Sequence, residues 1–195
     1  MSQSVIRTAT PDDRARVVDT VVAAFAGDPA FHYFFRDPAT FVSQATAFAG
    51  YLFDKRVGLD TVWIAEDGAA VAMWDPPTKP DTIAPTVTLE VSTDAMAQLD
   101  AYDAAVHGKL PTAPHWYLGV LGTHPDHAGR RLGRAVMAAG LAQAANDGVP
   151  AYLETARASN VDIYRRSGWE VTAAVAVPDL DVWVMRHPGN RGGSR

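Results

Sequence analysis

The sequence contains no cysteine, no long apolar run and no excess of basic residues. Without cysteine the chain can form no disulfide framework, no thiolate metal site and no cysteine nucleophile. No apolar stretch approaches the roughly 18 residues that a membrane-spanning helix needs. The net charge of −5 argues against binding to nucleic acid, because such proteins present a basic surface. We therefore expect neither a membrane nor a nucleic acid as a partner.

The remaining composition is that of a soluble globular protein, and a length of 195 residues favours one domain with one core. We expect this domain to span residues 1–187 and to be followed by a mobile tail over residues 188–195. The first four residues do not resemble a signal sequence. These features lead us to expect a cytoplasmic protein, either a monomer or a homodimer.

Apolar periodicity predicts strands that alternate with helices. The predicted strands cover residues 5–9, 61–66, 70–74, 116–121, 149–155, 169–177 and 181–186. The predicted helices run from Pro11 to before Gly27, over 41–53, over 93–107, from beyond Gly129 to Asp147, and from Ser159 or Asn160 to Gly168. A hairpin turn is predicted at Asp67-Gly68. This order of elements indicates a single α/β domain with a mixed, twisted central sheet flanked by helices.

The central unit of the chain is the stretch 116–133, which reads as an apolar strand, a loop and the start of a helix. A helix that opens from such a loop points unpaired backbone amides and its positive dipole end at one place. Arg130, Arg131 and Arg134 crowd this helix start, where cations would be unfavourable without an anion nearby. The arrangement favours a phosphate or pyrophosphate ligand. A solvated basic helix start that binds nothing remains the alternative.

Neither a nucleotide-hydrolysing phosphate loop nor a complete dinucleotide-binding Gly-x-Gly-x-x-Gly is present. Residues 128–133, AGRRLG, resemble motif A of the GCN5-related N-acetyltransferase (GNAT) superfamily, Gln/Arg-x-x-Gly-x-Gly/Ala, which holds the pyrophosphate of acetyl-CoA. Ala128 and Arg131 depart from that pattern. The resemblance implies acetyl-CoA as co-substrate.

Asn160 and Tyr164 lie four residues apart, so they share one face of the predicted short helix. The stretch 160–169 resembles motif B of the same superfamily, in which the asparagine contacts the pantetheine and the tyrosine lies beside the thioester sulfur. The resemblance implies that Tyr164 donates a proton to the departing thiolate. The alternative is a tyrosine packed against Trp169. The predicted cofactor-binding residues are Leu121, Gly122, Thr123, Ala128, Gly129, Arg130, Arg131, Leu132, Gly133, Arg134, Asn160 and Tyr164.

An amine that attacks a thioester must first lose its proton, so such a site needs a base. Glu154 is the first candidate, because a carboxylate within a strand is costly unless it is paired or faces a cleft. A structural carboxylate bonded to the Asn160 helix or to Arg157 is the alternative. Asp28 is a second candidate, or a plain turn residue. A backbone amide between Leu121 and Thr123 would stabilise the oxyanion if Gly122 lets the strand separate from its neighbour.

Aromatic side chains are dense at residues 31–35, where they either fill the core or line a pocket. The candidates for acceptor binding are Asp28, Tyr33, Phe34, Phe35, Trp74 and Trp116. His124 and His127 are three residues apart, but no spacing supplies a third metal ligand, so we expect no metal.

Within the superfamily the chain resembles the puromycin N-acetyltransferase-like proteins. The matching stretches are 24–26, 56–60, 67–72, 125–127, 148–151 and 153–155. The resemblance implies direct transfer of an acetyl group to a primary amine of a small molecule in a ternary complex, with an aminonucleoside antibiotic, and hence antibiotic resistance, as one candidate. A protein or peptide N-terminal acetyltransferase and a non-catalytic acyl-CoA-binding regulatory module remain alternatives.

Overall fold

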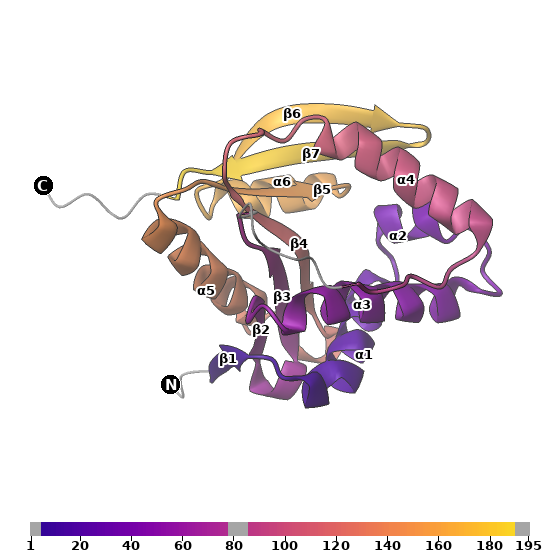
Figure 1. The fold of residues 1–195 in the computed structure, drawn as a ribbon, viewed down its shortest axis with the longest axis horizontal. Helices are drawn as coiled ribbons and strands as arrows, with labels where there is room; N and C mark the ends of the chain where they lie inside the picture. The colour runs from indigo at the N-terminus through magenta and orange to yellow at the C-terminus, as the bar shows by residue number, and fades with distance from the viewer. Residues whose placement is uncertain (1–4, 78–85, 190–195) are drawn as a thin grey trace, which may run out of the picture.

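The computed structural model describes residues 5–77 and 86–189. Within these residues the strands form one seven-stranded sheet in the order β1-β2-β3-β4-β5-β7-β6 (Figure 1). The strands are β1 (Ile6–Thr8), β2 (Val62–Ala65), β3 (Ala70–Asp75), β4 (Trp116–Thr123), β5 (Ala151–Thr155), β6 (Glu170–Val177) and β7 (Leu180–His187). Among the strands of the described residues only β4 and β5 are parallel neighbours, so the sheet is mixed, and the predicted α/β fold class is confirmed. Residues 190–195 of the predicted tail lie outside the described residues.

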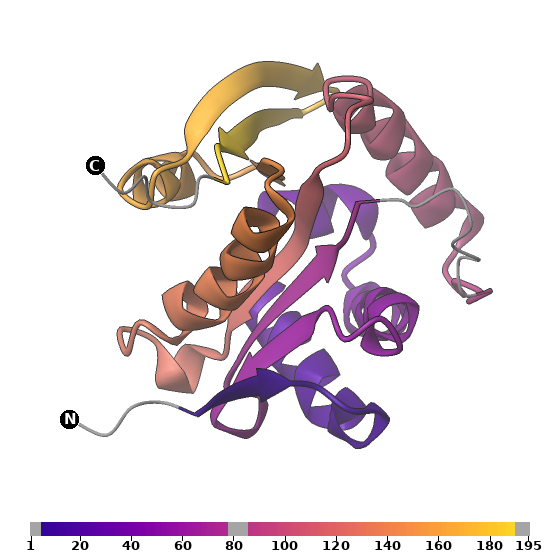
Figure 2. The ribbon, with the colours of Figure 1, turned by 60° about the vertical axis from the view of Figure 1, so that its left-hand side comes forward.

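The helices cover both faces of the sheet, with α5 on one face and α1 and α3 on the other (Figure 2). They are α1 (Arg14–Phe25), α2 (Pro29–Phe34), α3 (Phe41–Val57), α4 (Thr93–His107), α5 (Leu132–Asp147) and α6 (Ala158–Arg165). Short 3-10 turns lie at η1 (Pro11–Asp13), η2 (Glu66–Gly68) and η3 (Pro125–His127). Each face has its own apolar core, because alternate residues of the buried strands point to opposite sides.

Two helix starts differ from those that the sequence predicts. Asp28 is the N-cap of the unpredicted helix α2, and its carboxylate accepts hydrogen bonds from the amides of Ala30 and Phe31. The predicted caps of the short helix are wrong, because α6 begins at Ala158 with Arg157 as its N-cap. Asn160 therefore lies within the first turn.

The hairpin between β2 and β3 is confirmed, with Ala65 paired to Ala70. Its turn residues Glu66, Asp67 and Gly68 all have positive φ angles. Glycine adopts this conformation at little cost, as the Asp-Gly pattern predicts.

Candidate active site

A β-bulge in β4 creates the opening on which the site is built. Met73 pairs with Val120 and Trp74 pairs with Leu118, so Gly119 is an extra residue in β4. A side chain at this position would collide with the guanidinium of Arg56, since a Cβ would lie 2.9 Å from its Nη2. The bulge requires glycine for this close approach.

The two central strands separate at the same place. β4 pairs with β5 only through Trp116, Tyr117 and Leu118, although both strands continue further. The separation from β5 begins after Leu118 and includes Gly122, which packs against α1, where a Cβ would lie 3.2 Å from Cβ of Ala24. The backbone of β4 beyond Gly119 therefore lacks β5 as a neighbour.

A cavity of about 640 Å³ opens where the strands separate. Its floor is formed by residues 117–121 of β4 and 153–156 of β5 and the turn that follows it. Its walls come from the end of α1, from α2, α3, α4 and residues 87–89, and from the face of α6 that carries Asn160 and Tyr164. The walls combine aromatic rings with carboxylates, which suits a cationic ligand with an apolar body.

Glu154 lies in this cavity with its carboxylate held by two tyrosines. The hydroxyl of Tyr117 donates to Oε2, and the hydroxyl of Tyr102 donates to Oε1 at 3.4 Å. Burial raises the pKa of Glu154 to about 7, while the hydrogen bond from Tyr117 opposes this change. The carboxylate is therefore suited to exchange a proton near neutral pH, as a general base requires.

Tyr164 and Asn160 face the same cavity from α6. Burial, followed by the charge of Glu154, raises the pKa of the Tyr164 hydroxyl, so it remains a neutral donor. Its ring also packs edge-on against Trp169. Nδ2 of Asn160 donates to Oγ1 of Thr155 at 3.4 Å, which ties the start of α6 to the end of β5.

The start of α5 offers backbone amides. Arg131 is the N-cap in a left-handed conformation, with φ of 60°, and its side chain makes no capping hydrogen bond. Gly129 also has a positive φ of 79°, and no atom lies within 4 Å of the position of its Cβ. The first-turn amides have no partners within the helix, and this arrangement fits an anionic group.

One of the three arginines at this helix start is engaged within the protein. Nη1 of Arg130 lies 2.7 Å from a carboxylate oxygen of Glu66 and 3.1 Å from Nδ1 of His127. Arg131 and Arg134 are exposed. The predicted basic cluster is thus divided, and two of its cations face solvent.

The comparisons with known proteins agree on one fold. Residues 87–172 match the model of the acetyltransferase (GNAT) domain family. The chain has the GNAT acetyltransferase fold. The family match supports an acetyl-CoA-dependent N-acetyltransferase, and the GNAT family uses acetyl-CoA as co-substrate. The solved structures show the fold.

Three solved structures illustrate the likeness. The histone acetyltransferase HPA2 and related acetyltransferase from Corynebacterium glutamicum is 23% identical, with 96% of this chain and 97% of that chain covered and a TM-score of 0.73. Arylalkylamine N-acetyltransferase 2 from Aedes aegypti is 11% identical, with 97% and 100% covered and a TM-score of 0.68. The ribosomal-protein-S18-alanine N-acetyltransferase from Escherichia coli is 15% identical, with 99% and 98% covered and a TM-score of 0.54.

The GNAT fold of this chain brings together part of the predicted site. The predicted site residues that line the cavity are Asp28, Phe34, Leu121, Glu154, Asn160 and Tyr164. Gly122, Thr123 and residues 128–134 lie along the end of β4 and the start of α5, outside the cavity lining. Thr123 meets this helix start closely, since a Cβ on Gly133 would lie 2.9 Å from its Oγ1.

Four predicted acceptor residues do not line the cavity. Trp74 and Trp116 point to the opposite face of the sheet, where Trp74 packs on Gly140 of α5 and Trp116 donates to Asp147 at 2.8 Å. Tyr33 and Phe35 are buried in the core on the cavity side of the sheet. Strand alternation and helix packing turn these four rings into the cores, so the acceptor contacts predicted for them lie outside this cavity.

Several residues of the cavity were missed by the sequence analysis. Tyr117, Tyr102 and Asp75 line it, together with Arg56, which is only 3% exposed and lies 2.5 Å from the carboxylate of Asp75. The alternation along β4 was the available signal for Tyr117, since it places this residue on the face opposite to Trp116. No local pattern indicates the other three.

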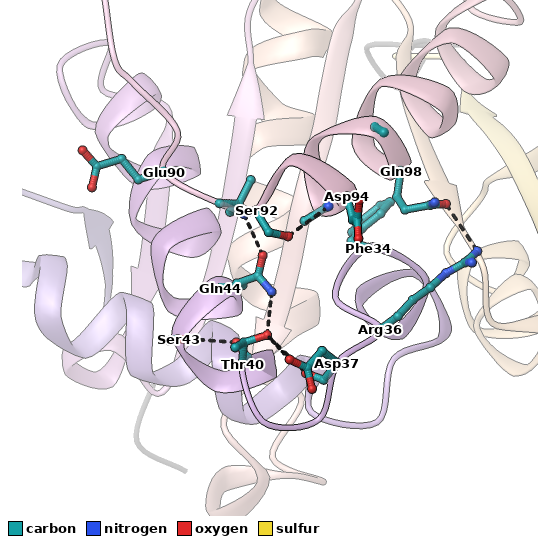
Figure 3. Close-up of a pocket in the computed structure, with 13 residues that line it drawn as sticks. Phe34, Arg36, Asp37, Thr40, Ser43, Gln44, Glu90, Ser92, Asp94 and Gln98 are labelled. Atoms are coloured by element: carbon teal, nitrogen blue, oxygen red, sulfur yellow. Dashed lines mark hydrogen bonds between the residues drawn. The ribbon is translucent and has the colours of Figure 1, made fainter.

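A second hollow, of about 920 Å³, lies between the start of α3 and the start of α4 (Figure 3). Its polar side chains bond to one another and to the backbone: Nε2 of Gln44 donates to Oγ1 of Thr40, and Oε1 of Gln44 accepts from the backbone amide of Ser92. It shares Phe34 with the first cavity but contains none of the three polar residues Glu154, Asn160 and Tyr164.

Residues 5–77 and 86–189 contain no group of three or more histidine, cysteine, aspartate or glutamate residues placed to hold a metal ion. No helix formed by these residues has the length and apolar character needed to cross a membrane.

Proposed function

We propose that this chain transfers the acetyl group of acetyl-CoA to the primary amine of a small molecule in the Glu154 cavity, by direct attack in a ternary complex. The observation that carries the proposal is the shared cavity: the Glu154 carboxylate, the Tyr164 hydroxyl and the unpaired part of β4 all border it. A base, a donor and backbone amides are the groups that aminolysis of a thioester needs.

Glu154 removes the proton from the acceptor ammonium in this proposal. Its pKa of about 7 means that the carboxylate is ionised in much of the protein at neutral pH and can accept a proton. Asp28, Asp100 and Asp103 also border the cavity, and their carboxylates favour entry of a cation.

Tyr164 stabilises the departing sulfur by a hydrogen bond rather than by full proton transfer. The reference pKa of a thiol is about 8.5 and that of a phenol about 10. Because the pKa of Tyr164 is raised further, complete transfer of its proton to the thiolate would be uphill. A neutral phenol still donates a hydrogen bond to developing negative charge.

The amides at the start of α5 hold the diphosphate of acetyl-CoA in the proposal, assisted by Arg131 and Arg134. The uncapped first turn and the open backbone at Gly129 support this role. Backbone amides of β4 beyond Gly119 then hold the oxyanion, because this segment is not paired with β5.

The acceptor is a small amine with an apolar or aromatic body. Aromatic side chains from α1, α2 and α3 (Phe25, Phe31, Phe34, Phe48 and Tyr51) support this choice by walling the cavity. A primary amine of an aminonucleoside antibiotic is one candidate of this class, and its acetylation would give resistance. A peptide N-terminus would require an open groove, which the walls from α2, α3 and α4 oppose. A non-catalytic module would not need Glu154 and Tyr164 in one cavity.

The test measures release of CoA thiol with a panel of small amines, puromycin among them, and with peptides that have free N-termini. We expect turnover with small aromatic amines, loss of most turnover in Tyr164→Phe, and unchanged CoA binding by calorimetry. Tyr33→Phe is the matched control, since Tyr33 is a buried tyrosine outside the cavity lining. CoA binding without turnover on any amine would support the regulatory module, and turnover only on peptides would support the N-terminal acetyltransferase.

A further inference from the structure

Tyr117 connects the two strands at the point where they separate. It pairs with Tyr152 of β5 in the last part of the shared ladder, and Glu154 lies two residues further along β5. The Tyr117 hydroxyl reaches across to Oε2 of Glu154. A side-chain hydrogen bond thus spans the gap just past the last main-chain pair, at Leu118 and Leu153.

The carboxylate of Glu154 has one donor on each oxygen. Tyr117 reaches Oε2 from β4, while Tyr102 reaches Oε1 from α4 at 3.4 Å. Two donors from different elements fix both the position and the rotation of the carboxylate group. The oxygens retain further lone pairs to accept a proton from a ligand in the cavity.

We propose that Tyr117 is a positioning residue, whose hydroxyl aims the Glu154 carboxylate at the acceptor amine across the gap between β4 and β5. The inference rests on the proposed function, in which Glu154 is the base. Tyr102 assists from α4 with a longer and weaker hydrogen bond.

Both tyrosines remain donors at working pH. Burial and the charge of Glu154 raise the pKa of Tyr117 and Tyr102 well above 10, so neither hydroxyl ionises. Removing a donor from Glu154 destabilises its charged form only, which raises its pKa. The titratable groups that act on Glu154 or respond to it are Tyr117 from β4, Tyr102 and Asp103 from α4, and Tyr164 from α6. The other titratable groups lining the cavity are Asp28, Lys55, Arg56, Asp75, Asp100 and His107.

The experiment records kcat/KM against pH with one acceptor amine for the wild type and the variants. The acidic limb that belongs to Glu154 is identified as the limb that disappears in Glu154→Gln. In Tyr117→Phe we expect this limb to move to higher pH by about one unit, since a hydrogen bond to a charged group contributes on that order. Tyr102→Phe should move it in the same direction by a smaller amount.

Tyr152→Phe is the matched control. Tyr152 is a buried tyrosine on β5, two residues before Glu154, and its ring packs against His115 rather than bonding to the carboxylate. The acidic limb of the Tyr152→Phe profile should stay at the pH of the wild-type limb. A purely structural role of Tyr117 would lower activity at every pH without moving the limb.

The outcomes separate the two proposals. A limb that is lost in Glu154→Gln but unmoved in Tyr117→Phe overturns the positioning role alone. A limb that persists in Glu154→Gln overturns the base assignment, and the positioning role with it. Thermal unfolding checks that each variant is folded. If Tyr117→Phe does not fold, Tyr102→Phe decides the question, with a shifted limb in favour and an unmoved limb against.

Discussion

Glu154 should make the folded chain less stable as the pH rises from 4 to 8. Burial raises its pKa from 4.5 to about 7, so the folded state binds this proton more tightly than the unfolded state. The resulting stabilisation is complete below pH 4.5 and is lost as the pH rises through 7. At about 1.4 kcal/mol for each pKa unit, the loss is about 3 kcal/mol.

Replacing Glu154 by glutamine removes this dependence, because an amide does not titrate. The difference in unfolding free energy, variant minus wild type, should therefore increase by about 3 kcal/mol between pH 4 and pH 8. Contributions from other groups cancel in this difference. Asp13 is one of these groups. Its bidentate hydrogen bonds from Arg7 lower its pKa, so its ionised form stabilises the fold. This stabilisation is lost as the pH falls, whereas that of Glu154 is lost as the pH rises.

Urea unfolding at each pH, followed by circular dichroism, measures this difference. Glu170→Gln serves as the control, since Glu170 is exposed on β6 and its carboxylate stays in water. An equally large change for this exposed variant would contradict the assignment of the effect to burial. A flat difference for Glu154→Gln would refute the reasoning, because it would mean that burial does not penalise the charge of Glu154.

Three further changes probe packing, a buried ion pair and cofactor binding. Gly140→Ala should destabilise the chain by about 2 kcal/mol in urea unfolding, because the new Cβ would lie 2.2 Å from the ring of Trp74. Asp75→Asn should cost about 3 kcal/mol by the same measurement, since it leaves the guanidinium of Arg56 buried without its counter-ion. Arg134→Ala should raise KM for acetyl-CoA about fivefold at low salt and less at high salt, if this cation faces the diphosphate.

Each of these changes has a control on the same chain. Gly58→Ala should be neutral or slightly stabilising, because no atom lies within 4 Å of its Cβ position. Asp162→Asn breaks an exposed pair with Arg165 and should cost less than 1 kcal/mol. Arg16→Ala removes an exposed arginine of α1 and should leave KM unchanged. Equal effects of a change and its control would contradict the reason given for that change.

The order of elements could be predicted because it depends on local patterns. The period of the apolar residues distinguished strand from helix, and the helix predicted over residues 93–107 is α4. The spacing of Asn160 and Tyr164 placed both on one helix face, and both line the cavity. Arg131 departs from the motif at a position where the backbone is left-handed, the conformation that favours glycine.

The face of the sheet to which each side chain points could not be predicted in the same way. Trp74 and Trp116 looked like pocket residues, but their strands turn them toward α5. Which face of a sheet holds a cavity depends on which helices cover each face, and no local pattern records this. The bulge at Gly119 could not be predicted either, because it is defined by the pairing of β4 with β3 and not by a local pattern.

The sequence by itself determined the strands, most of the helices and the two motif stretches, since these follow from propensity and spacing within a few turns of chain. Only the tertiary structure decided the environment of Glu154. Tyr102 and Tyr117 are 52 and 37 residues away from it along the chain, and folding brings both hydroxyls to one carboxylate. Its pKa depends on burial and on these contacts, which exist only once the sheet has formed and α4 has packed over the cavity.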